Sequence, residues 1–486
     1  MTLLDIATWE KKVFLGGWAS ANGSVAEVLE PATGTVLGHV GTASPADIDA
    51  ACARAATAQR AWEDRSFEDR AAILRRAGQL FEEHAEEIGT WIVREAGSVR
   101  AKAEIETRMA AQECYAAAAL AAHPSGEVLP SADGRLSLSR RVAAGVVGVI
   151  APFNFPLVLS IRAVAPALAL GNSVVLKPDT RTAVCGGVAL AAVFAEAGVP
   201  EDVLHVLPGA ADAGAALVEN RYTRVIAFTG STAAGRKVGV AAASRLKRAH
   251  LELGGNSAVI VLPDADVEAA AAAGAWGSYL HQGQICMAAG RHLVHESIAD
   301  DYVRVLAEKA RALAVGDPFT QQVALGPIID TGQRDTVHRL VTASVEEGAT
   351  LVEGGTYEGL YYRPTVLDNV RRDTAAYCQE VFGPVAPVLR YGSVEEAIDL
   401  ACDSEYGLSL SVLSADAMAA WDVARRIPSG LVHINDQTVG DSAHVPFGGV
   451  GASGNGGRVG GAVANLEAFT ETQWATIQGP IQRYPF

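Results

Sequence analysis

The sequence predicts an α/β protein built on open, doubly wound parallel sheets. From residue 142 onward, apolar runs of strand length alternate with alanine-rich stretches of helical period. Parallel strands need crossover connections, and right-handed crossovers place helices on both faces of a sheet. The 49 glycines and the hydrophobic content of 49% indicate a globular enzyme and exclude a disordered chain. At 486 residues, two large lobes with an accessory element are expected.

Helices and a hairpin are predicted at the start of the chain. Ser44 is a candidate N-cap with Pro45 at the first helical position, and helical periodicity then runs to Glu95. A second helical stretch covers 103–122. The next segment, HPSGEVLPSADGRLSLSRR, is polar and alternating, which predicts a protruding hairpin that could serve assembly.

Strands and helices then alternate. The first run has strands VAAGVVGVI, SVVLKP, DVLHVLPG and RVIAFTG, with helices over 157–170, 183–197 and 211–218. After residue 251 a second run has strands SAVIVL, HLVH, PTVL, PVAPVLRY and LSLSVL, with helices over 267–281 and 298–314. This run suggests a second lobe that ends near PFGGVGASGNGG. The final FTETQWATIQ could add an edge strand to a neighbour or to the early hairpin.

The charge balance argues for a small-molecule partner. Lys and Arg number 39 against 55 Asp and Glu, which gives a formal net charge of −16 without any basic block. Nucleic acid and anionic membranes bind basic patches, so neither is expected as a partner. The N-terminus MTLLDIATWEKKVF lacks the layout of a signal peptide. Residues 142–160 carry no charge, but their prolines and glycines indicate a buried strand entering a loop, not a membrane helix.

Six cysteines lie far apart, without a CxxC pair. The spacing predicts neither a disulfide framework nor a metal site, and it indicates a reducing, cytoplasmic setting. Cys286, in HQGQICMAAGR, is flanked by glycines and small residues, and Gln282 and Gln284 add a polar approach, as for a presented nucleophile. A buried structural cysteine explains the local sequence equally well.

Two polar residues have settings suited to catalysis. Glu252, in LELGGN, lies between leucines, where desolvation would raise its pKa toward the range of a general base. A salt-bridged or capping glutamate is the alternative. Asn154, in APFNFP, is an amide in an apolar loop at a strand end, which suits an oxyanion donor. An Asn that only stabilises the turn is the rival interpretation.

A phosphate site is a weaker prediction. Gly230 ends a predicted strand and Gly235 opens the next helix, so backbone N–H groups there could hold a phosphate, although the pattern is neither GxGxxG nor a P-loop. An ordinary glycine turn explains it too. Lys177, at the end of SVVLKP, is placed for ribose hydroxyls or phosphate, or it is a solvated strand-end lysine.

Seven motifs together resemble the aldehyde dehydrogenase superfamily. They are APFNFP, LKP, FTGST, LELGGN, GQIC, EVFGP and PFGGVGASG, in family order and at family separations over nearly the whole chain. The resemblance implies that Cys286 adds to an aldehyde and that Asn154 and the Cys286 N–H hold the oxyanion. It also implies hydride transfer to a nicotinamide and hydrolysis of a thioester by water that Glu252 activates.

The resemblance also implies a cofactor site. Lys177 would bind the adenosine ribose, Ser231 the pyrophosphate and Glu380 the nicotinamide ribose, with Phe382 packed near the nicotinamide. A core-packing role for the Phe382 ring is compatible with this. His281 is interpreted as structural, since the family mechanism needs no histidine there.

One departure from the family bears on the cofactor. NAD-selective members often carry a glutamate three residues after the lysine, where it repels a 2′-phosphate, and Thr180 stands there in this chain. Asp179 beside it could partly replace that acid, so NAD or NADP is predicted. Phe153 replaces a tryptophan common in relatives, which puts little in doubt.

The finer resemblance is to the benzaldehyde, vanillin and salicylaldehyde dehydrogenase branch. An aromatic aldehyde is therefore expected, with Ile285, Met287 and Phe447 lining an apolar substrate site, although Phe447 could have a plain packing role. Arg162 leaves a semialdehyde open, because it could bind a carboxylate or form a structural ion pair. An aliphatic aldehyde, a CoA-acylating enzyme and a catalytically silent binding protein are further alternatives, the last two opposed by Glu252.

The family architecture implies a division of the chain. Residues 1–122 and 143–250 would form a Rossmann-type dinucleotide-binding domain, and 251–448 an α/β catalytic domain. Residues 123–142 and 463–486 would form a small β element for assembly into a homodimer or homotetramer.

Overall fold

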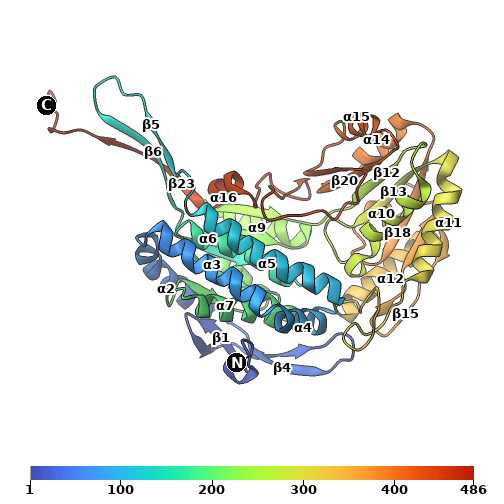
Figure 1. The fold of residues 1–486 in the computed structure, drawn as a ribbon, viewed down its shortest axis with the longest axis horizontal. Helices are drawn as coiled ribbons and strands as arrows, with labels where there is room; N and C mark the ends of the chain where they lie inside the picture. The colour runs from blue at the N-terminus through green and yellow to red at the C-terminus, as the bar shows by residue number, and fades with distance from the viewer. Residues whose placement is uncertain (1) are drawn as a thin grey trace.

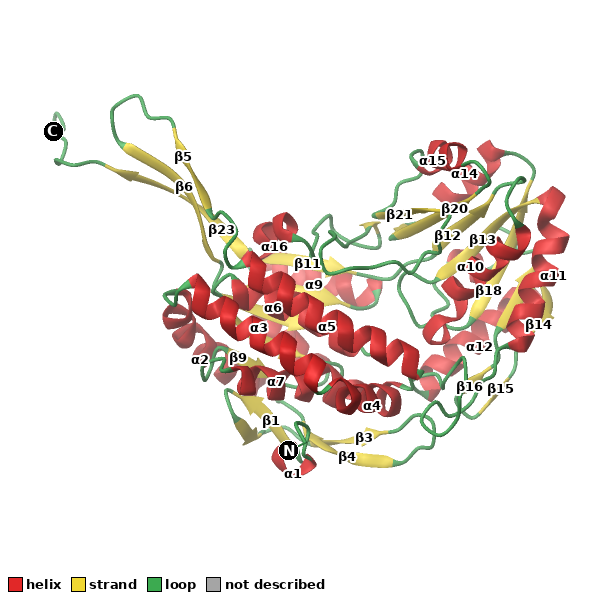
Figure 2. Cartoon of the chain, in the orientation of Figure 1, coloured by secondary structure: helices red, strands yellow, loops and turns green. Residues whose placement is uncertain are grey.

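The computed structural model describes residues 2–486 and contains two seven-stranded sheets with helices on both faces (Figures 1 and 2). The first sheet has the strand order β11-β10-β7-β8-β9-β1-β2. Its strands are β1 (Lys12–Leu15), β2 (Trp18–Ser20), β7 (Val146–Ile150), β8 (Ser173–Lys177), β9 (Leu204–Val206), β10 (Thr223–Thr229) and β11 (Arg248–Glu252). Strands β7 to β11 are mutually parallel, whereas β1 is antiparallel to β9 and β2.

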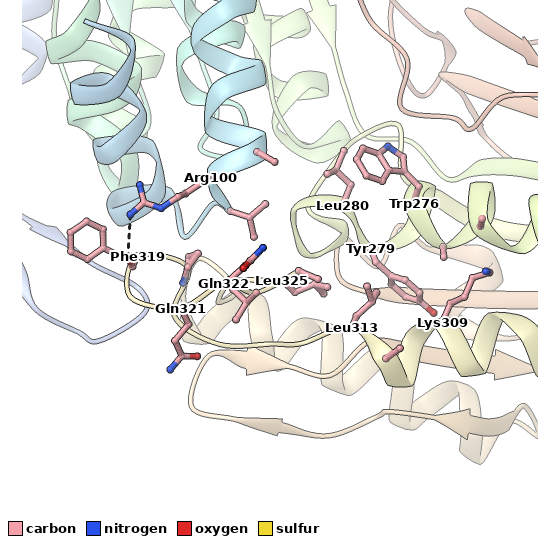
Figure 3. Close-up of a pocket in the computed structure, with 18 of the residues that line it drawn as sticks. Arg100, Trp276, Tyr279, Leu280, Lys309, Leu313, Phe319, Gln321, Gln322 and Leu325 are labelled. Atoms are coloured by element: carbon pink, nitrogen blue, oxygen red, sulfur yellow. Dashed lines mark hydrogen bonds between the residues drawn. The ribbon is translucent and has the colours of Figure 1, made fainter.

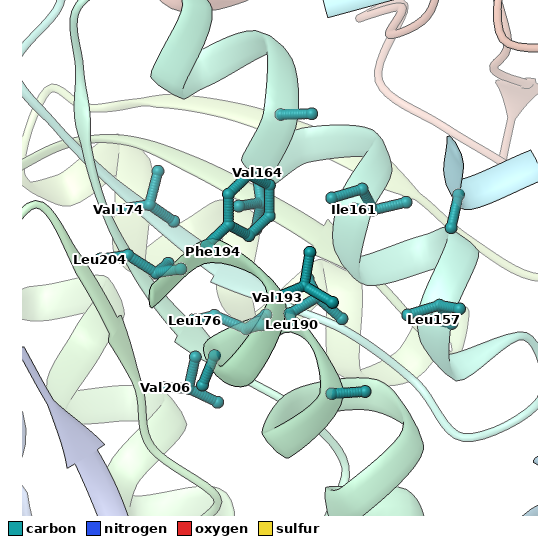
Figure 4. Packing of buried hydrophobic residues seen from close by; sticks show 14 of the residues in the cluster. Leu157, Ile161, Val164, Val174, Leu176, Leu190, Val193, Phe194, Leu204 and Val206 are labelled. Atoms are coloured by element: carbon teal, nitrogen blue, oxygen red, sulfur yellow. The ribbon is translucent and has the colours of Figure 1, made fainter. Parts of the chain in front are cut away.

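Two apolar clusters cover the two faces of this sheet. Along β8, Val174 and Leu176 belong to one cluster and Val175 to the other, because successive strand side chains point to opposite faces. The first cluster packs under α3 (Phe67–Glu83), α4 (Ala85–Ala96), α5 (Arg100–Leu120), α6 (Pro156–Ala169) and α7 (Ala189–Ala197), as Figure 4 shows in part. The second packs under α2 (Pro45–Glu63), α8 (Ala211–Glu219) and α9 (Thr232–Ser244). Both faces are therefore dry, as a doubly wound sheet requires.

The second sheet has the order β14-β17-β18-β13-β12-β20-β21. Its strands are β12 (Ser257–Val261), β13 (Ala289–His295), β14 (Thr350–Glu353), β17 (Thr365–Asp368), β18 (Val385–Tyr391), β20 (Ser409–Leu413) and β21 (Leu431–Ile434). Strand β14 is antiparallel to β17, and the other neighbours are parallel. The helices of this half are α10 (Val267–Tyr279), α11 (Glu296–Ala312), α12 (Thr331–Glu346), α13 (Ala375–Cys378), α14 (Val394–Cys402) and α15 (Ala417–Ala424).

A three-stranded sheet projects from the body of the molecule (Figure 1). It joins β5 (Gly126–Leu129) and β6 (Leu136–Ala143) to the C-terminal β23 (Thr470–Ile477). The predicted hairpin is therefore present, and the final strand pairs with it in the same chain over eight residue pairs. Large apolar side chains on this arm face solvent: Val128 is 73% exposed and Trp474 is 72% exposed.

Short elements complete the chain. They are α1 (Ile6–Trp9), β3 (Val25–Leu29), β4 (Val36–Gly41), η1 (Thr180–Thr182), η2 (Val184–Val188), η3 (Leu280–Gly283), β15 (Tyr357–Glu358), β16 (Tyr361–Tyr362), β19 (Tyr406–Gly407), β22 (Val450–Gly451) and α16 (Ala462–Phe469). In residues 2–486 no helix is both long and apolar enough to span a bilayer. The uncharged stretch 142–160 consists of the end of β6, strand β7, a loop and the start of α6.

Several elements differ from the sequence-based expectation. The helix expected over 183–197 begins with a π-helical turn, η2, before α7. The helix expected to reach residue 281 ends at Tyr279, because the backbone turns left-handed at His281. Strand β11 was not predicted, and it extends the first sheet to Glu252. The predicted boundary between 250 and 251 lies inside that strand, and the division into domains stays a prediction.

Candidate active site

Cys286 lies half-buried in the short loop that joins α10 to β13. The loop follows an unusual backbone path, since His281 and Gln282 have φ values of 48° and 58°. At Gly283, where φ is 65°, a Cβ atom would collide with the carbonyl oxygen of Gly383, so the path requires glycine. Left-handed backbone at non-glycine residues stores strain and is found most often at functional sites. This path fixes where the Cys286 thiol is presented.

The predicted substrate residues gather around this thiol. Ile285, Met287 and Phe447 form one buried apolar cluster with Leu408, and Cys286 packs against it. Phe447 comes from the glycine-rich segment more than 150 residues further along the chain and is 3% exposed. The surroundings of Cys286 are therefore apolar on the side that these residues form.

Asn154 reaches the same loop from the end of β7. Its Nδ2 donates a hydrogen bond to the carbonyl oxygen of Gln284, at 2.9 Å, two residues before Cys286. The backbone carbonyl oxygen of Asn154 accepts a hydrogen bond from Nζ of Lys102, also at 2.9 Å. Lys102 forms a buried ion pair with Glu106, which accepts hydrogen bonds from the first backbone N–H groups of α6. The buried ion pair of Lys102 and Glu106 thus stabilises the Asn154 loop, and this pair was not predicted from the sequence.

Glu252 ends β11 beside the glycine-rich segment. A β-bridge joins it to Gly454, and the N–H of Leu253 donates to the carbonyl oxygen of Ser453 at 3.0 Å. The carboxylate is buried, and within residues 2–486 neither of its oxygens has a hydrogen-bond partner. Burial raises the pKa of Glu252 well above its ordinary value, and the charges of Arg458 and Arg162 oppose that rise. A buried carboxylate of raised pKa is a candidate general base, as the sequence predicted.

The electrostatic setting of Cys286 favours the neutral thiol. Burial raises its pKa above the ordinary value, and the carboxylates of Glu380 and Glu252 raise it further. The carbonyl oxygen of Cys286 lies against Gly255, where any Cβ would collide with it. Because Gly255 also binds Glu380, the thiol and both carboxylates belong to one site.

Glu380 meets the paired glycines that follow Glu252. The N–H of Gly255 donates to its Oε1 at 3.0 Å, and a side chain on Gly254 would collide with the carboxylate. Burial raises the pKa of Glu380 to about 7. A half-buried carboxylate with free acceptor capacity fits a partner that brings hydroxyl donors.

Lys177 ends β8, as predicted, but it is buried. It is 9% exposed, and its Nζ donates a long hydrogen bond of 3.3 Å to the carbonyl oxygen of Pro178. Its alkyl chain packs near Gly214 of α8, where an added Cβ would lie 3.6 Å from Cδ. Burial lowers the pKa of Lys177. A desolvated ammonium group with one long bond is poorly satisfied, which fits a ribose or phosphate partner.

The predicted glycine turn begins α9. Ser231 is the N-cap of this helix, and its hydroxyl accepts from the N–H of Ala234 at 3.3 Å. Gly235 packs so closely on Leu253 that a Cβ would collide with that side chain. Packing therefore explains this glycine by itself. Gly230 and Ser231 are half-buried and exposed, respectively, at the start of a 13-residue helix, where the helix dipole favours an anion.

Thr180 begins the turn after Lys177 and is half-buried. Its neighbour Asp179 is engaged by two nitrogens of Arg181, at 2.9 and 2.8 Å. Burial raises the pKa of Asp179, but the contacts to Arg181 outweigh it and leave that pKa lowered. Asp179 is therefore an ionised carboxylate whose charge Arg181 largely neutralises. The suggestion that Asp179 replaces the missing glutamate is weakened by this pairing.

Phe382 has a strained backbone with φ of 52°. Its carbonyl oxygen accepts from Nε2 of Gln333 at 2.9 Å. Its ring meets Phe153 edge to face, with centroids 5.9 Å apart, and the guanidinium of Arg181 lies 4.2 Å from the centroid of the Phe153 ring. The left-handed residue and these contacts set the orientation of the Phe382 ring.

Arg162 forms a structural ion pair, one of the two interpretations that the sequence left open. Its Nε donates to Oε1 of Glu113 at 2.9 Å, and Nη1 pairs with Asp441. Its guanidinium also lies 5.3 Å from the centroid of the Phe447 ring. Burial disfavours the cation, but the two carboxylates outweigh it and raise the pKa of Arg162. Neither carboxylate was singled out from the sequence, because nothing local marks a partner 279 residues away.

His281 has the environment of a structural residue. Its ring is buried and meets Phe155 edge to face, with centroids 5.7 Å apart. Burial lowers its pKa well below the ordinary value, and the charge of Lys102 adds to this effect. A neutral imidazole at this place fits the interpretation from sequence.

A separate cavity of about 960 Å³ opens between α10, the start of α5 and the loop 313–325 (Figure 3). Trp276, Tyr279 and Leu280 line it from α10 and its end, and Phe319 lies at the other side. Leu280 also packs against the apolar cluster at Cys286, but the residues with predicted roles do not line this cavity. In the part of the chain that the structure describes, no cluster of three His, Cys, Asp or Glu side chains could hold a metal ion.

Known proteins share both the sequence and the fold. The aldehyde dehydrogenase family profile matches residues 18–475. The chain is 63% identical to a vanillin dehydrogenase from Amycolatopsis sp. over all of both chains, and 49% identical to a benzaldehyde dehydrogenase [NAD(+)] from Pseudomonas putida over 98% of each. A crystal structure of a salicylaldehyde dehydrogenase from Pseudomonas putida G7, complexed with salicylaldehyde, superposes with a TM-score of 0.93 at 35% identity and covers 98% of this chain and 99% of that one.

The chain belongs to the aldehyde dehydrogenase family. The predicted fold class, the family and the class of enzyme are confirmed. The roles of the individual site residues, including the predicted cofactor ligands, stay predictions that the geometry described above makes testable.

Proposed function

We propose that this protein oxidises an aromatic aldehyde to the carboxylic acid, with NAD or NADP as the hydride acceptor. The observation that carries the proposal is a thiol packed on an apolar cluster, with an amide bound to its loop and a buried carboxylate whose charge acts on it. These groups come from three distant parts of the chain: Cys286, Asn154 and Glu252. Relatives named for vanillin, benzaldehyde and salicylaldehyde support the choice of an aromatic aldehyde.

In this mechanism Cys286 is the nucleophile. Its thiolate adds to the carbonyl carbon, and the Asn154 amide with the Cys286 N–H stabilises the oxyanion that forms. A bound NAD or NADP would supply the acceptor for the hydride that leaves this carbon, and Cys286 would then hold the acyl group as a thioester. Glu252 then takes a proton from water as the water oxygen attacks the thioester carbon. The C–S bond breaks, and the acid and the thiolate separate.

The Asn154 amide must change its partner for this role. It donates to the carbonyl oxygen of Gln284 in the structure, and an oxyanion on the substrate would compete for the same donor. An ionised acceptor forms a stronger hydrogen bond than a neutral carbonyl. The exchange therefore favours the anionic intermediate over the neutral aldehyde, which is what catalysis requires.

Residues from both halves of the chain would hold the cofactor. Lys177 and Glu380 would bind its two riboses, because one is a poorly satisfied ammonium and the other a carboxylate with free acceptor capacity. The N-terminus of α9, with Gly230 and Ser231, would take the pyrophosphate. Phe382 would pack against the nicotinamide.

The site is less suited to binding a semialdehyde than an aromatic aldehyde. A second carboxylate on the substrate would need a cation, and Arg162 already pairs with both Glu113 and Asp441. An aromatic ring needs only apolar surface, which Ile285, Met287 and Phe447 supply.

Substitution of the two catalytic residues tests the proposal. Cys286→Ala is expected to abolish oxidation of benzaldehyde and to leave cofactor binding intact, as measured by fluorescence titration. Glu252→Gln is expected to give a burst of reduced cofactor of about one equivalent and then to stall at the thioester. Normal steady-state turnover by Glu252→Gln would contradict its role as the deacylation base.

A substrate panel tests the aromatic preference. Aromatic aldehydes, short aliphatic aldehydes and semialdehydes are compared, each with NAD and with NADP. The highest kcat/KM is expected for an aromatic aldehyde, and a semialdehyde that exceeded it would overturn that part of the proposal.

Assembly and location complete the proposal. The projecting arm of β5, β6 and β23 exposes Val128 and Trp474, and a surface of this kind supports assembly into a homodimer or homotetramer. The unpaired cysteines of the described chain support a cytoplasmic location. Light scattering would establish the oligomeric state.

A further inference from the structure

We propose that Arg458 is a positioning residue for Glu252, whose charge keeps the Glu252 side chain in the carboxylate form that accepts a proton from water. The inference deepens the proposed function and rests on it. Arg458 belongs to none of the motifs singled out from the sequence. It lies in the glycine-rich segment, which pairs with the end of β11 through the bridge between Gly454 and Glu252.

The backbone of this segment places Arg458 beside Glu252. Phe447 and Val459 form an antiparallel bridge with hydrogen bonds of 2.7 and 3.2 Å, which closes the segment into a loop. Within that loop Gly454 bridges to Glu252. Arg458 therefore lies one residue from the closing pair, on the side where Glu252 is anchored.

Gly448 leaves the space between the two side chains open. A Cβ built on Gly448 would lie 2.8 Å from Oε1 of Glu252 and also 2.8 Å from Cδ of Arg458. These two atoms are therefore at most twice that distance apart, and a side chain at position 448 would come between them. Cδ carries the guanidinium group, so the cation of Arg458 is close enough to act on the Glu252 carboxylate in a site that excludes water.

The charge of Arg458 is not taken up by another acid. Its Nη1 donates to the carbonyl oxygens of Gly449 and Gly457, at 3.0 and 2.9 Å. Among residues 2–486 no Asp or Glu oxygen lies within 4.0 Å of its nitrogens. The charge of Arg458 is accordingly free to act on Glu252.

Among the other charged groups around Glu252, only Arg162 acts in the same direction, and its effect is smaller than that of Arg458. Arg162 shares its charge between Glu113 and Asp441, and Asp441 itself disfavours a second carboxylate nearby. Cys286 and Glu380 also belong to this site, and each becomes negative when it ionises, so neither stabilises a carboxylate at Glu252.

His250, on the same strand, adds no charge near neutral pH. Its ring nitrogen would lie 2.8 Å from a Cβ on Gly457, and burial lowers its pKa to about 4. Of the two cations that offset the burial of Glu252, Arg458 therefore has the larger effect.

The test measures deacylation directly. Enzyme, benzaldehyde and saturating NAD are mixed, the reaction is quenched in acid after set times, and intact mass spectrometry follows the decay of the acyl adduct on Cys286. The decay rate is measured from pH 5 to pH 9 for the natural protein, Arg458→Gln, Arg458→Lys and the control Arg236→Gln. Arg236 is an exposed arginine on α9 that pairs with Glu405, so its loss removes the same formal charge away from Glu252.

Removal of the cation destabilises the carboxylate and raises its pKa, so the acid limb of the profile moves to higher pH. A shift of about one pH unit is expected for Arg458→Gln, which makes deacylation about tenfold slower on the acid side of the limb. Arg458→Lys should restore the limb to its natural position, and Arg236→Gln should leave it unchanged.

Three results would overturn the inference. Equal slowing at every pH, or equal losses in Arg458→Gln and Arg458→Lys, would assign Arg458 to loop structure through its bonds to Gly449 and Gly457. If Arg458→Gln still formed the adduct but its acid limb did not shift, the charge of Arg458 would not act on Glu252. Absence of any adduct on Cys286 in the natural protein, with any aldehyde, would overturn the proposed function and the inference with it.

Discussion

Nη1 of Arg181 lies 2.7 Å from Oδ2 of Asp330, and this ion pair joins the turn after β8 of the first sheet to the start of α12 beside the second. The backbone N–H of Gln333 donates to the Asp330 side chain, and the side chain of Gln333 donates to the carbonyl oxygen of Phe382. Arg181 packs over the ring of Phe153. These contacts form a continuous ring of interactions around Phe382, because the aromatic rings of Phe153 and Phe382 also pack against each other. The orientation of the ring proposed to pack on the nicotinamide thus depends on contacts from both halves of the chain.

Asp330→Asn is expected to raise KM for the cofactor about two- to fivefold. An exposed ion pair contributes about 0.2 to 1 kcal/mol, and Asn retains the N-cap of α12. Steady-state kinetics at varied cofactor provides the measurement. Asp335→Asn is the matched control, since Asp335 is exposed on the same helix and pairs with its neighbour Arg334. Equal effects of the two changes would contradict a role of the Arg181–Asp330 contact in positioning Phe382.

Cofactor choice should respond to Thr180. Thr180→Glu places a carboxylate where the 2′-phosphate of NADP is expected, and charge repulsion should lower kcat/KM for NADP about tenfold more than for NAD. The existing acid, Asp179, is neutralised by Arg181 and so does not already exert this effect. Thr180→Gln, of the same size without the charge, is the control. If Gln and Glu shifted the preference equally, bulk rather than charge would be responsible.

The thiol of Cys286 should alkylate slowly at neutral pH in the free enzyme. Its pKa is raised by burial and by the carboxylates of Glu380 and Glu252, so the reactive thiolate fraction grows only as pH rises. Glu252→Gln removes one of these negative charges, which lowers the pKa, and alkylation at pH 8 should become several-fold faster. Mass spectrometry of the Cys286 peptide, with exposed Glu405→Gln as control, measures the rate. Slower alkylation would mean that Glu252 removes the thiol proton.

Much of the site was predictable because its residues end strands. Asn154, Lys177 and Glu252 follow or end β7, β8 and β11, and the carboxyl ends of parallel strands meet at one edge of a sheet. Strand β11 itself was missed, since its sequence RAHLE is short and has only one large aliphatic residue. The family motifs, and not the strand pattern, marked Glu252.

The buried charges could not be predicted in the same way. Arg162 and Asp441 are 279 residues apart, and Lys102 reaches Asn154 across 52. Hydrophobic period and turn residues are local signals, whereas these pairings depend on how two folded halves meet. Arg458 escaped notice for the same reason, because its neighbour Glu252 is near in space only.

The ion pair below Asn154 gives a prediction for both stability and rate. Glu106→Ala would leave the Lys102 ammonium buried without its partner, which costs about 3 to 5 kcal/mol, and would remove the acceptor of the Leu157 N–H. Because Lys102 also holds the Asn154 carbonyl, kcat should fall along with the urea midpoint of unfolding. Glu104→Ala, on the exposed face of the same helix, should change neither. If Glu106→Ala lowered the midpoint and left kcat intact, the pair would stabilise the fold without positioning the oxyanion donor.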